Sequence, residues 1–231
     1  MSVGVSVIVP VHNGEPFLAE AIDSLLAQTH RPLEVVVVDN MSTDDSAQIA
    51  AAYGDPVRVV EAAPLGPPVA RNRGIREATF PLIAFLDADD LFHPEKLERQ
   101  VAHLASRADL DISLCVAENF WEPGLEEEQR RYAAMGRDRA THAFGTLLTT
   151  HEVFDRVGLI DEGLPHGDQI EWFVRAGAAG MVMEALPEVL MRRRMHPASR
   201  SHQLRDLDVY LDLAGSLIAR RRRAAAPDAS R

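Results

Sequence analysis

The carboxylate pair Asp87 and Asp89 is the feature of this sequence with the clearest chemical meaning. The pair closes an apolar run, in the segment Phe-Leu-Asp-Ala-Asp-Asp at residues 85–90. A continuous apolar run is typical of a strand that is buried on both faces, and carboxylates must emerge at its end. Alternate residues of an extended strand share a face, so both carboxylates can converge on one divalent cation, which can neutralise a diphosphate. Taken alone, Asp-x-Asp also fits a turn, because Asp favours turns.

Other polar residues follow the neighbouring predicted strands. Asn13 ends the first strand and Asp39 the second, while Arg71 and Arg73 lie near the start of a predicted helix. The carboxyl ends of strands in open α/β sheets are where ligands bind. Carboxylates gathered there would repel one another without a cation, and arginine forks suit diphosphate oxygens. The alternative for the two arginines is a surface helix held by salt bridges.

The pattern of apolar residues alternates between strands and helices. Strands are predicted at 3–11, 33–38, 57–60 and 82–87, and helices at 16–28, from 42 to about 53, at 67–78 and from 93 to about 106. This order predicts a mainly parallel sheet with right-handed crossovers. Further along, 118–141 is expected to form an exposed helical or loop insertion. Strands at 146–150, 181–186 and 188–191, a helical turn at 152–157, a helix at 168–179 and a final helix beyond 205 complete the prediction.

Composition narrows the class of protein. With 231 residues, of which 46% are hydrophobic, the chain can bury a core of about one domain or one and a half. The net charge of −11 argues against a nucleic-acid-binding protein. A single cysteine, Cys115, and the lack of a long apolar stretch or a leader pattern predict a soluble, cytoplasmic protein.

Positive charge is concentrated near the carboxyl end. The arginines are Arg192, Arg193, Arg194, Arg200, Arg205 and Arg220 to Arg223. A solvated tail and a segment that contacts anions or a membrane surface peripherally are both compatible with this pattern.

Four ordered segments carry a resemblance to a known family. They are Val7 to Glu15 (VIVPVHNGE), Val38 to Asp44 (VDNMSTD), Ala70 to Ile75 (ARNRGI) and Phe85 to Asp90 (FLDADD). The chain resembles the family 2 glycosyltransferases with the GT-A fold. Looser similarity continues through residues 153–158, 167–172 and 194–196. The resemblance implies a Rossmann-like, mainly parallel nucleotide-binding sheet flanked by helices, with a smaller acceptor-side subregion.

The same resemblance implies an enzyme of the hexosyltransferase type and assigns the donor site. A nucleotide-diphosphate sugar, foremost a UDP-sugar, would be bound with Mn²⁺ or Mg²⁺ as the cofactor. Asp39 would accept a hydrogen bond from the base, Asp87 would contact ribose or metal, and Asp89 would hold the metal. The remaining expected donor contacts are Pro10, Val11, His12, Asn13, Glu15, Asn40, Arg71, Ala88 and Arg194.

Two departures from the family pattern affect the expected site. Asn40 stands where the family commonly has Asp, and His12 where it has an aromatic residue. In the region of the catalytic base, counting back from Arg175 places the family's Asp at Gln169, and an amide cannot accept a proton. The candidates for the base are therefore Asp168 first and Glu171 second, for an inverting reaction that needs one base.

The segment Arg194-Met195-His196 resembles the family's carboxy-terminal Arg-x-His loop. His196 would contact the metal or a phosphate, Arg194 would contact a phosphate, and closure of the loop would exclude water. His12 and His166 are weaker candidates for contacts with the sugar or the acceptor. A lone histidine is also common as a structural residue.

Two rival classes and the partners remain open. The missing family Asp at Gln169 also fits a binding module that recognises a nucleotide sugar without transferring it. A nucleotidyltransferase is the third possible class, although the sequence has no Gly-rich, basic amino-terminal loop. The acceptor could be a glycan, a peptide, a small natural product or a lipid-linked sugar. The expected domain is 1–205, with a donor half at 1–110 and an acceptor half at 111–205, followed by a helix and basic tail at 206–231.

Overall fold

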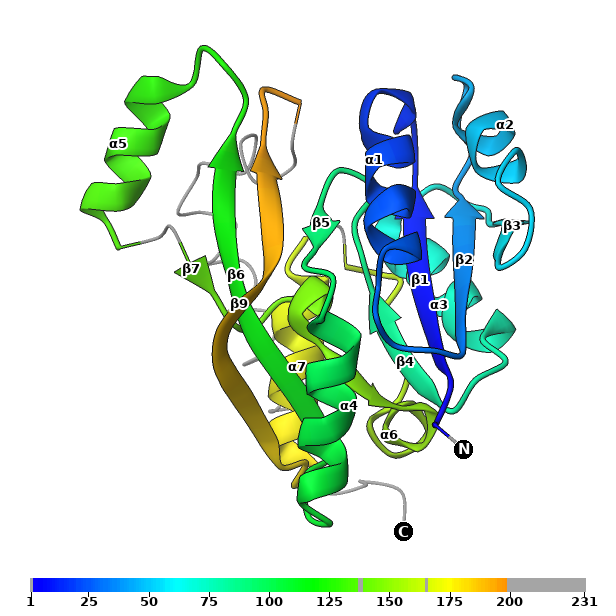
Figure 1. Cartoon of the computed structure of the whole chain (residues 1–231), viewed down its shortest axis with the longest axis vertical. Helices are drawn as coiled ribbons and strands as arrows, with labels where there is room; N and C mark the ends of the chain where they lie inside the picture. Colours follow the sequence, from blue (N-terminus) through cyan, green and yellow to red (C-terminus); the bar gives the residue numbers. More distant parts are fainter. Residues whose placement is uncertain (1, 137–138, 165, 199–231) are drawn as a thin grey trace, which may run out of the picture.

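The protein is built around one mixed sheet (Figure 1). The computed structural model describes residues 2–136, 139–164 and 166–198. The predicted final helix and the arginines from Arg200 onward lie outside these residues. The strands follow the order β3-β2-β1-β4-β8-β6-β9-β5, and β7 pairs with β6.

The first half of the sheet is parallel, as the sequence predicts. It consists of β1 (Val5–Val11), β2 (Leu33–Asp39), β3 (Val57–Glu61) and β4 (Leu82–Phe85). The apolar residues of β1, β2 and β4 are buried on both faces, which is what a central parallel sheet requires, whereas β3 at the edge of the sheet is partly exposed. All four strands end at one edge, so the polar residues that follow them gather there.

The second half adds strands of both directions. β8 (Leu148–Thr150) pairs antiparallel with β4 and with β6 (Ile112–Trp121), and β6 pairs in parallel with β9 (Met183–Met195). Two short strands, β5 (Leu91–Phe92) and β7 (Arg139–Ala140), pair antiparallel with β9 and β6. The sheet is therefore continuous from the first half of the chain into the second.

Helices cover both faces of the sheet and bury alternate residues of each strand. Val7 and Val9 of β1 pack in one apolar cluster with residues of α1 (Glu15–Leu26), α2 (Ser46–Ala51) and α4 (Lys96–Ser106). Ile8 packs in the opposite cluster with α3 (Pro67–Glu77), α6 (His151–Val157) and α7 (Asp168–Ala178). The result is a three-layer α/β domain.

Helix α3 lies unusually close to β1. A Cβ atom added to Gly74 would lie 2.3 Å from Cγ2 of Ile8, so only glycine allows this approach. The close packing fixes the first turns of α3, and with them Arg71, beneath the sheet edge.

Two predictions for the second half are wrong in detail. Residues 118–121 belong to β6 rather than to an insertion, although 126–134 form the exposed helix α5 (Glu126–Ala134), which projects from the end of β6 (Figure 1). The two strands predicted at 181–186 and 188–191 form one strand, β9. The ladder between β6 and β9 shifts register around Pro187, and this irregularity accommodates a residue that has no N–H to donate.

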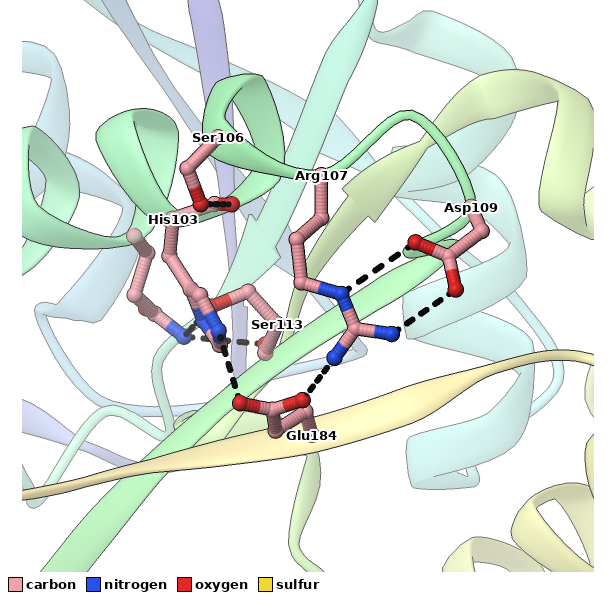
Figure 2. Close-up of polar contacts among 7 residues, drawn as sticks. His103, Ser106, Arg107, Asp109, Ser113 and Glu184 are labelled. Atoms are coloured by element: carbon pink, nitrogen blue, oxygen red, sulfur yellow. Dashed lines mark hydrogen bonds and ion pairs between the residues drawn. The ribbon is translucent and has the colours of Figure 1, made fainter.

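A polar network holds the edge of the sheet where β6 and β9 begin (Figure 2). Nδ1 of His103 lies 2.9 Å from the Ser113 hydroxyl, and Arg107 forms an ion pair with Asp109 at 2.7 Å and another with Glu184. The network joins the end of α4 to β6 and β9. It anchors these elements at the edge away from the strand ends that carry the candidate site.

Cys115 is fully buried in β6. Burial raises the pKa of its thiol, which keeps it in the neutral form. In the described ranges, no helix is both long and apolar enough to cross a membrane.

Candidate functional site

A cleft of about 1630 Å³ opens at the carboxyl ends of β1 and β4 and extends to α5 and α7. Most of the residues predicted for the site line it: Pro10, Val11, His12, Asn13, Asn40, Arg71, Asp87, Ala88, Asp89, Asp168, Arg194 and His196. His166 and Gln169 line it as well. The sheet edge thus collects side chains from segments up to 186 residues apart, from Pro10 to His196.

Asp89 and His196 meet in the cleft. Nε2 of His196 lies 3.0 Å from Oδ2 of Asp89, and the histidine ring also packs on Phe17, with ring centroids 4.7 Å apart. The side chain of His196 is 12% exposed and that of Asp89 31%. The Asp-x-Asp segment and the Arg-x-His segment therefore meet in the cleft.

Asp90 provides a buried anchor directly behind this pair. Its Oδ1 accepts a hydrogen bond from the backbone N–H of Arg194 at 2.9 Å, which ties the end of β9 to the Asp-x-Asp turn. Burial, together with the charges of Asp89 and Asp87, raises the pKa of the Asp90 carboxyl well above its ordinary value. The crowding of three carboxyl groups at this turn favours a bound cation.

Arg71 joins the two sides of the cleft. One Nη donates to Asp87 at 2.7 Å and the other to Asp168 at 3.0 Å, while the guanidinium lies 5.3 Å from the centre of the Phe144 ring. Burial alone would lower the pKa of Arg71, but the attraction of the two carboxylates outweighs it and raises the pKa. A permanently charged arginine therefore connects the predicted donor-side carboxylate with the predicted base.

Arg194 bonds to several groups of the protein around the Asp-x-Asp turn. Its guanidinium donates to Glu122 at 2.5 Å, to Glu20 and to the backbone carbonyl of Asp89 at 3.0 Å. It is sandwiched between two rings, 4.7 Å from the centre of Phe17 and 4.5 Å from that of Phe120. The side chain thus links α1, β6 and the Asp-x-Asp turn. No sequence pattern points to Glu20, Glu122 or either ring as its partners.

The start of α7 places the candidate base. Gly167 adopts a left-handed conformation with φ of 74°, which turns the chain into the helix and directs Asp168 into the cleft. Asp168 is 4% exposed. Gln169 accepts a hydrogen bond from the backbone N–H of Phe144 at 2.7 Å, so its amide has a structural role.

Glu171 lies outside the lining of the cleft. Its Oε1 accepts a hydrogen bond from Nε of Arg175 at 2.8 Å, and the same arginine donates to the carbonyls of Val157 and Leu159. Glu171 therefore belongs to a network that ties α7 to the end of α6. Of the two candidate bases, Asp168 is the one whose position suits contact with a substrate.

The loop after β1 lines the other end of the cleft. His12 contacts the carbonyl of Asn40 through Nδ1 at 3.0 Å, and Oδ1 of Asn13 accepts a hydrogen bond from the backbone of Thr43 at 2.8 Å. Glu15 and Asp39 lie next to this loop but outside the cleft lining. The backbone N–H of Ser42 donates to Asp39 at 3.3 Å.

The side chain of Asn40 explains its departure from the family's Asp. Its Nδ2 donates to the carbonyls of Ala62 and Pro64 at 2.8 and 3.0 Å, and its Oδ1 accepts from the backbone of Gly66 at 2.6 Å. A carboxylate could not make the first two bonds. Asn40 therefore fixes the loop that leads into α3.

The side chains at the Asp-x-Asp turn fit a cation whose remaining ligands come from a substrate. No cluster of three or more His, Cys, Asp or Glu side chains arranged to hold a metal occurs among the described residues. Asp89 and His196 are close together, while Asp87 is engaged by Arg71. In many phosphate sites, Mg²⁺ is bound by one or two carboxylates, and phosphate oxygens and water complete its coordination.

The sequence model of the family described as glycosyl transferase family 2 matches residues 6–159. The chain belongs to this family. An uncharacterized glycosyltransferase of Rickettsia prowazekii is 30% identical over 223 residues, which cover 90% of this chain and 70% of that protein. The uncharacterized glycosyltransferase EpsJ of Bacillus subtilis is 30% identical over 214 residues, 84% of this chain and 62% of EpsJ. These relatives confirm the predicted enzyme class, a glycosyltransferase.

Solved structures confirm the predicted GT-A fold. TarS of Staphylococcus aureus in complex with UDP-GlcNAc superposes with a TM-score of 0.71 at 21% identity, covering 90% of this chain and 64% of that chain. The mannosyltransferase PcManGT of Pyrobaculum calidifontis, in complex with GDP-Man and Mn²⁺, gives a TM-score of 0.63 at 26% identity. The match covers 82% of this chain and 56% of PcManGT. The chain thus spans less than two thirds of either structure.

Proposed function

We propose that the chain is a metal-dependent, inverting glycosyltransferase that moves a sugar from a nucleotide-diphosphate sugar, foremost a UDP-sugar, to an acceptor nucleophile. The observation that carries the proposal is the joint placement of Asp87, Asp89 and Asp168 in one cleft, with Arg71 between the donor and acceptor sides. The UDP-GlcNAc bound to TarS and the GDP-Man and Mn²⁺ bound to PcManGT support a nucleotide-sugar donor and a divalent metal.

The proposal divides the work between the two halves of the chain. Residues 1–110 would bind the donor, and residues 111–205 would bind the acceptor and supply the base. The loop from Pro10 to Asn13 would line the nucleotide, with Asp39 and Asn40 next to it. Asp89 and His196 would hold the metal, and Asp87 would contact ribose or metal. A bound cation would supply charge neutralisation for the departing diphosphate.

Asp168 is the proposed general base. During transfer, the acceptor oxygen would bond to the anomeric carbon while the bond from that carbon to the diphosphate oxygen breaks. The acceptor proton would pass to Asp168, and the nucleoside diphosphate would leave with the electron pair. Attack from the face opposite the leaving group gives inversion and needs one carboxylate. Arg71 would orient Asp168 through the bond at 3.0 Å.

We also propose a cytoplasmic location, which rests on the single cysteine and the composition.

Calorimetric titration of UDP-glucose, UDP-GlcNAc, UDP-galactose and GDP-mannose, each with and without Mn²⁺, tests the donor assignment. One donor is expected to bind only with Mn²⁺, and Asp89→Ala is expected to abolish that binding. Asp155→Ala, which removes an exposed carboxylate of α6 far from the cleft lining, is the matched control and should bind like the wild type. Failure of all four donors to bind a folded protein would overturn the proposal.

A further inference from the structure

The lining of the cleft includes basic and apolar side chains from the second half of the chain. They include a group that we name the acceptor wall: Arg131, Tyr132, Met135, Arg139, Ile170 and Arg193. The donor side contributes Asp87, Asp89 and Asp90. In a chain with a net charge of −11, this cleft thus has the three arginines of the acceptor wall in its lining as well as three aspartates.

Two arginines of the wall are available to a ligand. Within the described ranges, the side chains of Arg131 and Arg139 form neither a hydrogen bond nor an ion pair, whereas arginines such as Arg99, Arg107 and Arg156 pair with carboxylates. The third, Arg193, donates through Nε to Asn119 at 2.9 Å. A chain with 35 acidic residues against 24 basic ones offers many partners, so arginines left without them in a cleft indicate an anionic ligand.

Apolar side chains lie in the same wall. Met135 is 56% exposed and Ile170 is 42% exposed, although both are large hydrophobic residues. Tyr132 packs edge-on against Trp121 of β6, with ring centroids 5.2 Å apart, and so fixes α5 beside the cleft. Helix α5 buries none of its residues, and its Arg131 and Tyr132 line the cleft.

The size of the cleft leaves room for a second substrate. Pockets that enclose one drug-sized ligand have volumes of about 300–1,000 Å³. At about 1630 Å³, this cleft can hold a nucleotide sugar on the donor side and another molecule against the acceptor wall.

We propose that the acceptor is a phosphate-bearing amphiphile. Arg131 and Arg139 bind its phosphate, Tyr132, Met135 and Ile170 contact its apolar part, and its hydroxyl lies at Asp168. The proposal rests on the proposed function, because it takes Asp168 as the base. A lipid-linked phosphate in a membrane and a soluble phosphorylated amphiphile both have this chemistry.

Calorimetry with three probes tests the proposal. n-Octyl phosphate, n-octyl β-glucoside and inorganic phosphate are titrated below the micelle concentration, both without nucleotide and with saturating UDP and Mn²⁺. Octyl phosphate is expected to bind at least tenfold more tightly than either other probe under both conditions. Equal affinity of octyl glucoside would overturn the anionic part, and equal affinity of inorganic phosphate would overturn the apolar part. Displacement of octyl phosphate by UDP would place it in the donor site and overturn the assignment.

Variants locate the binding to the wall. The double variant Arg131→Gln/Arg139→Gln is expected to weaken octyl phosphate binding at least tenfold. Arg130→Gln removes a neighbouring arginine of α5 that does not line the cleft, so it should have no effect. Unchanged affinity in the double variant would contradict the proposal. Retained UDP binding by this variant would show that the donor site is intact, which separates this outcome from failure of the proposed function.

Co-sedimentation separates the two sources of the ligand. Vesicles of phosphatidylcholine with farnesyl phosphate are expected to retain the wild type, and not the double variant, if the acceptor is membrane-bound. Binding of soluble octyl phosphate without retention on the vesicles supports a soluble amphiphile. Retention of both proteins to the same extent would contradict a role for the arginines.

Discussion

Replacement of Lys96 by methionine should stabilise the protein at neutral pH and remove a pH dependence. Lys96 is fully buried at the start of α4. Its ammonium donates to Oε1 of Gln100 at 2.7 Å and lies 3.9 Å from the centre of the Phe92 ring. These contacts do not replace hydration fully, and burial lowers the pKa of Lys96 from 10.5 to about 8.

The magnitude follows from this pKa difference. Each pKa unit corresponds to about 1.4 kcal/mol, so the charged form of Lys96 is disfavoured in the folded state by about 3 kcal/mol relative to the unfolded chain. Below pH 8 both states carry the proton and the full cost is present. Between about pH 8 and 10.5 the folded state loses the proton while the unfolded state keeps it, so the stability contributed by Lys96 rises with pH.

Urea denaturation of the wild type and Lys96→Met at pH 7, 8, 9 and 10 measures this difference. The free energy of unfolding of the wild type minus that of the variant is expected to increase by about 2 to 3 kcal/mol across the series. The series is measured in a Cys115→Ala background, because the charge of Lys96 lowers the pKa of that thiol. The remaining groups titrate alike in both proteins and cancel. Lys96→Arg, which keeps its charge throughout, serves as the control. A difference that stays constant from pH 7 to 10 would refute the reasoning.

Further predictions concern residues that connect the cleft to the core. Arg71→Met leaves the buried Asp168 carboxylate without its cation and should lower the free energy of unfolding by about 3 to 5 kcal/mol in chemical denaturation. Adding Asp168→Asn should recover part of this loss, and strictly additive effects would contradict direct coupling. Asn40→Asp, which restores the family's residue, should destabilise the protein by about 2 kcal/mol or more because it cannot donate to the carbonyls of Ala62 and Pro64. Wild-type stability of that variant, measured in the same way, would show that these bonds are not required.

The sequence predicts the fold of the first half of the chain well, because local signals dominate there. The β-branched runs that become β1 and β2 are continuous and buried, and each ends in a polar residue at the sheet edge. The Asp-x-Asp pair and Arg71 lie at ends of elements whose order follows from strand and helix alternation. Parallel topology then brings these residues to one edge without further information.

The second half of the chain depends on contacts that local patterns do not reveal. Pro187 interrupts the apolar run of β9 and suggests two strands, while the register shift that accommodates it depends on β6, about 70 residues away. The ion pair of Arg71 with Asp168 spans 97 residues, and the stacking of Arg194 on Phe17 brings together the two ends of the described chain. Such pairings are set by tertiary packing, so their partners could not be predicted from spacing.

The release of nucleoside diphosphate from a bound donor tests the central claim most directly, because it separates a working transferase from a binding module. With the donor and metal identified by titration, UDP formation is measured for the wild type, Asp168→Asn and Glu171→Gln, each shown to bind the donor. The wild type is expected to hydrolyse the donor slowly, and Asp168→Asn at least a hundredfold more slowly than the wild type. Glu171→Gln should lose much less of the hydrolysis rate, because Glu171 lies outside the cleft lining. Tight donor binding without release by the wild type, or unchanged release by Asp168→Asn, would contradict the central claim.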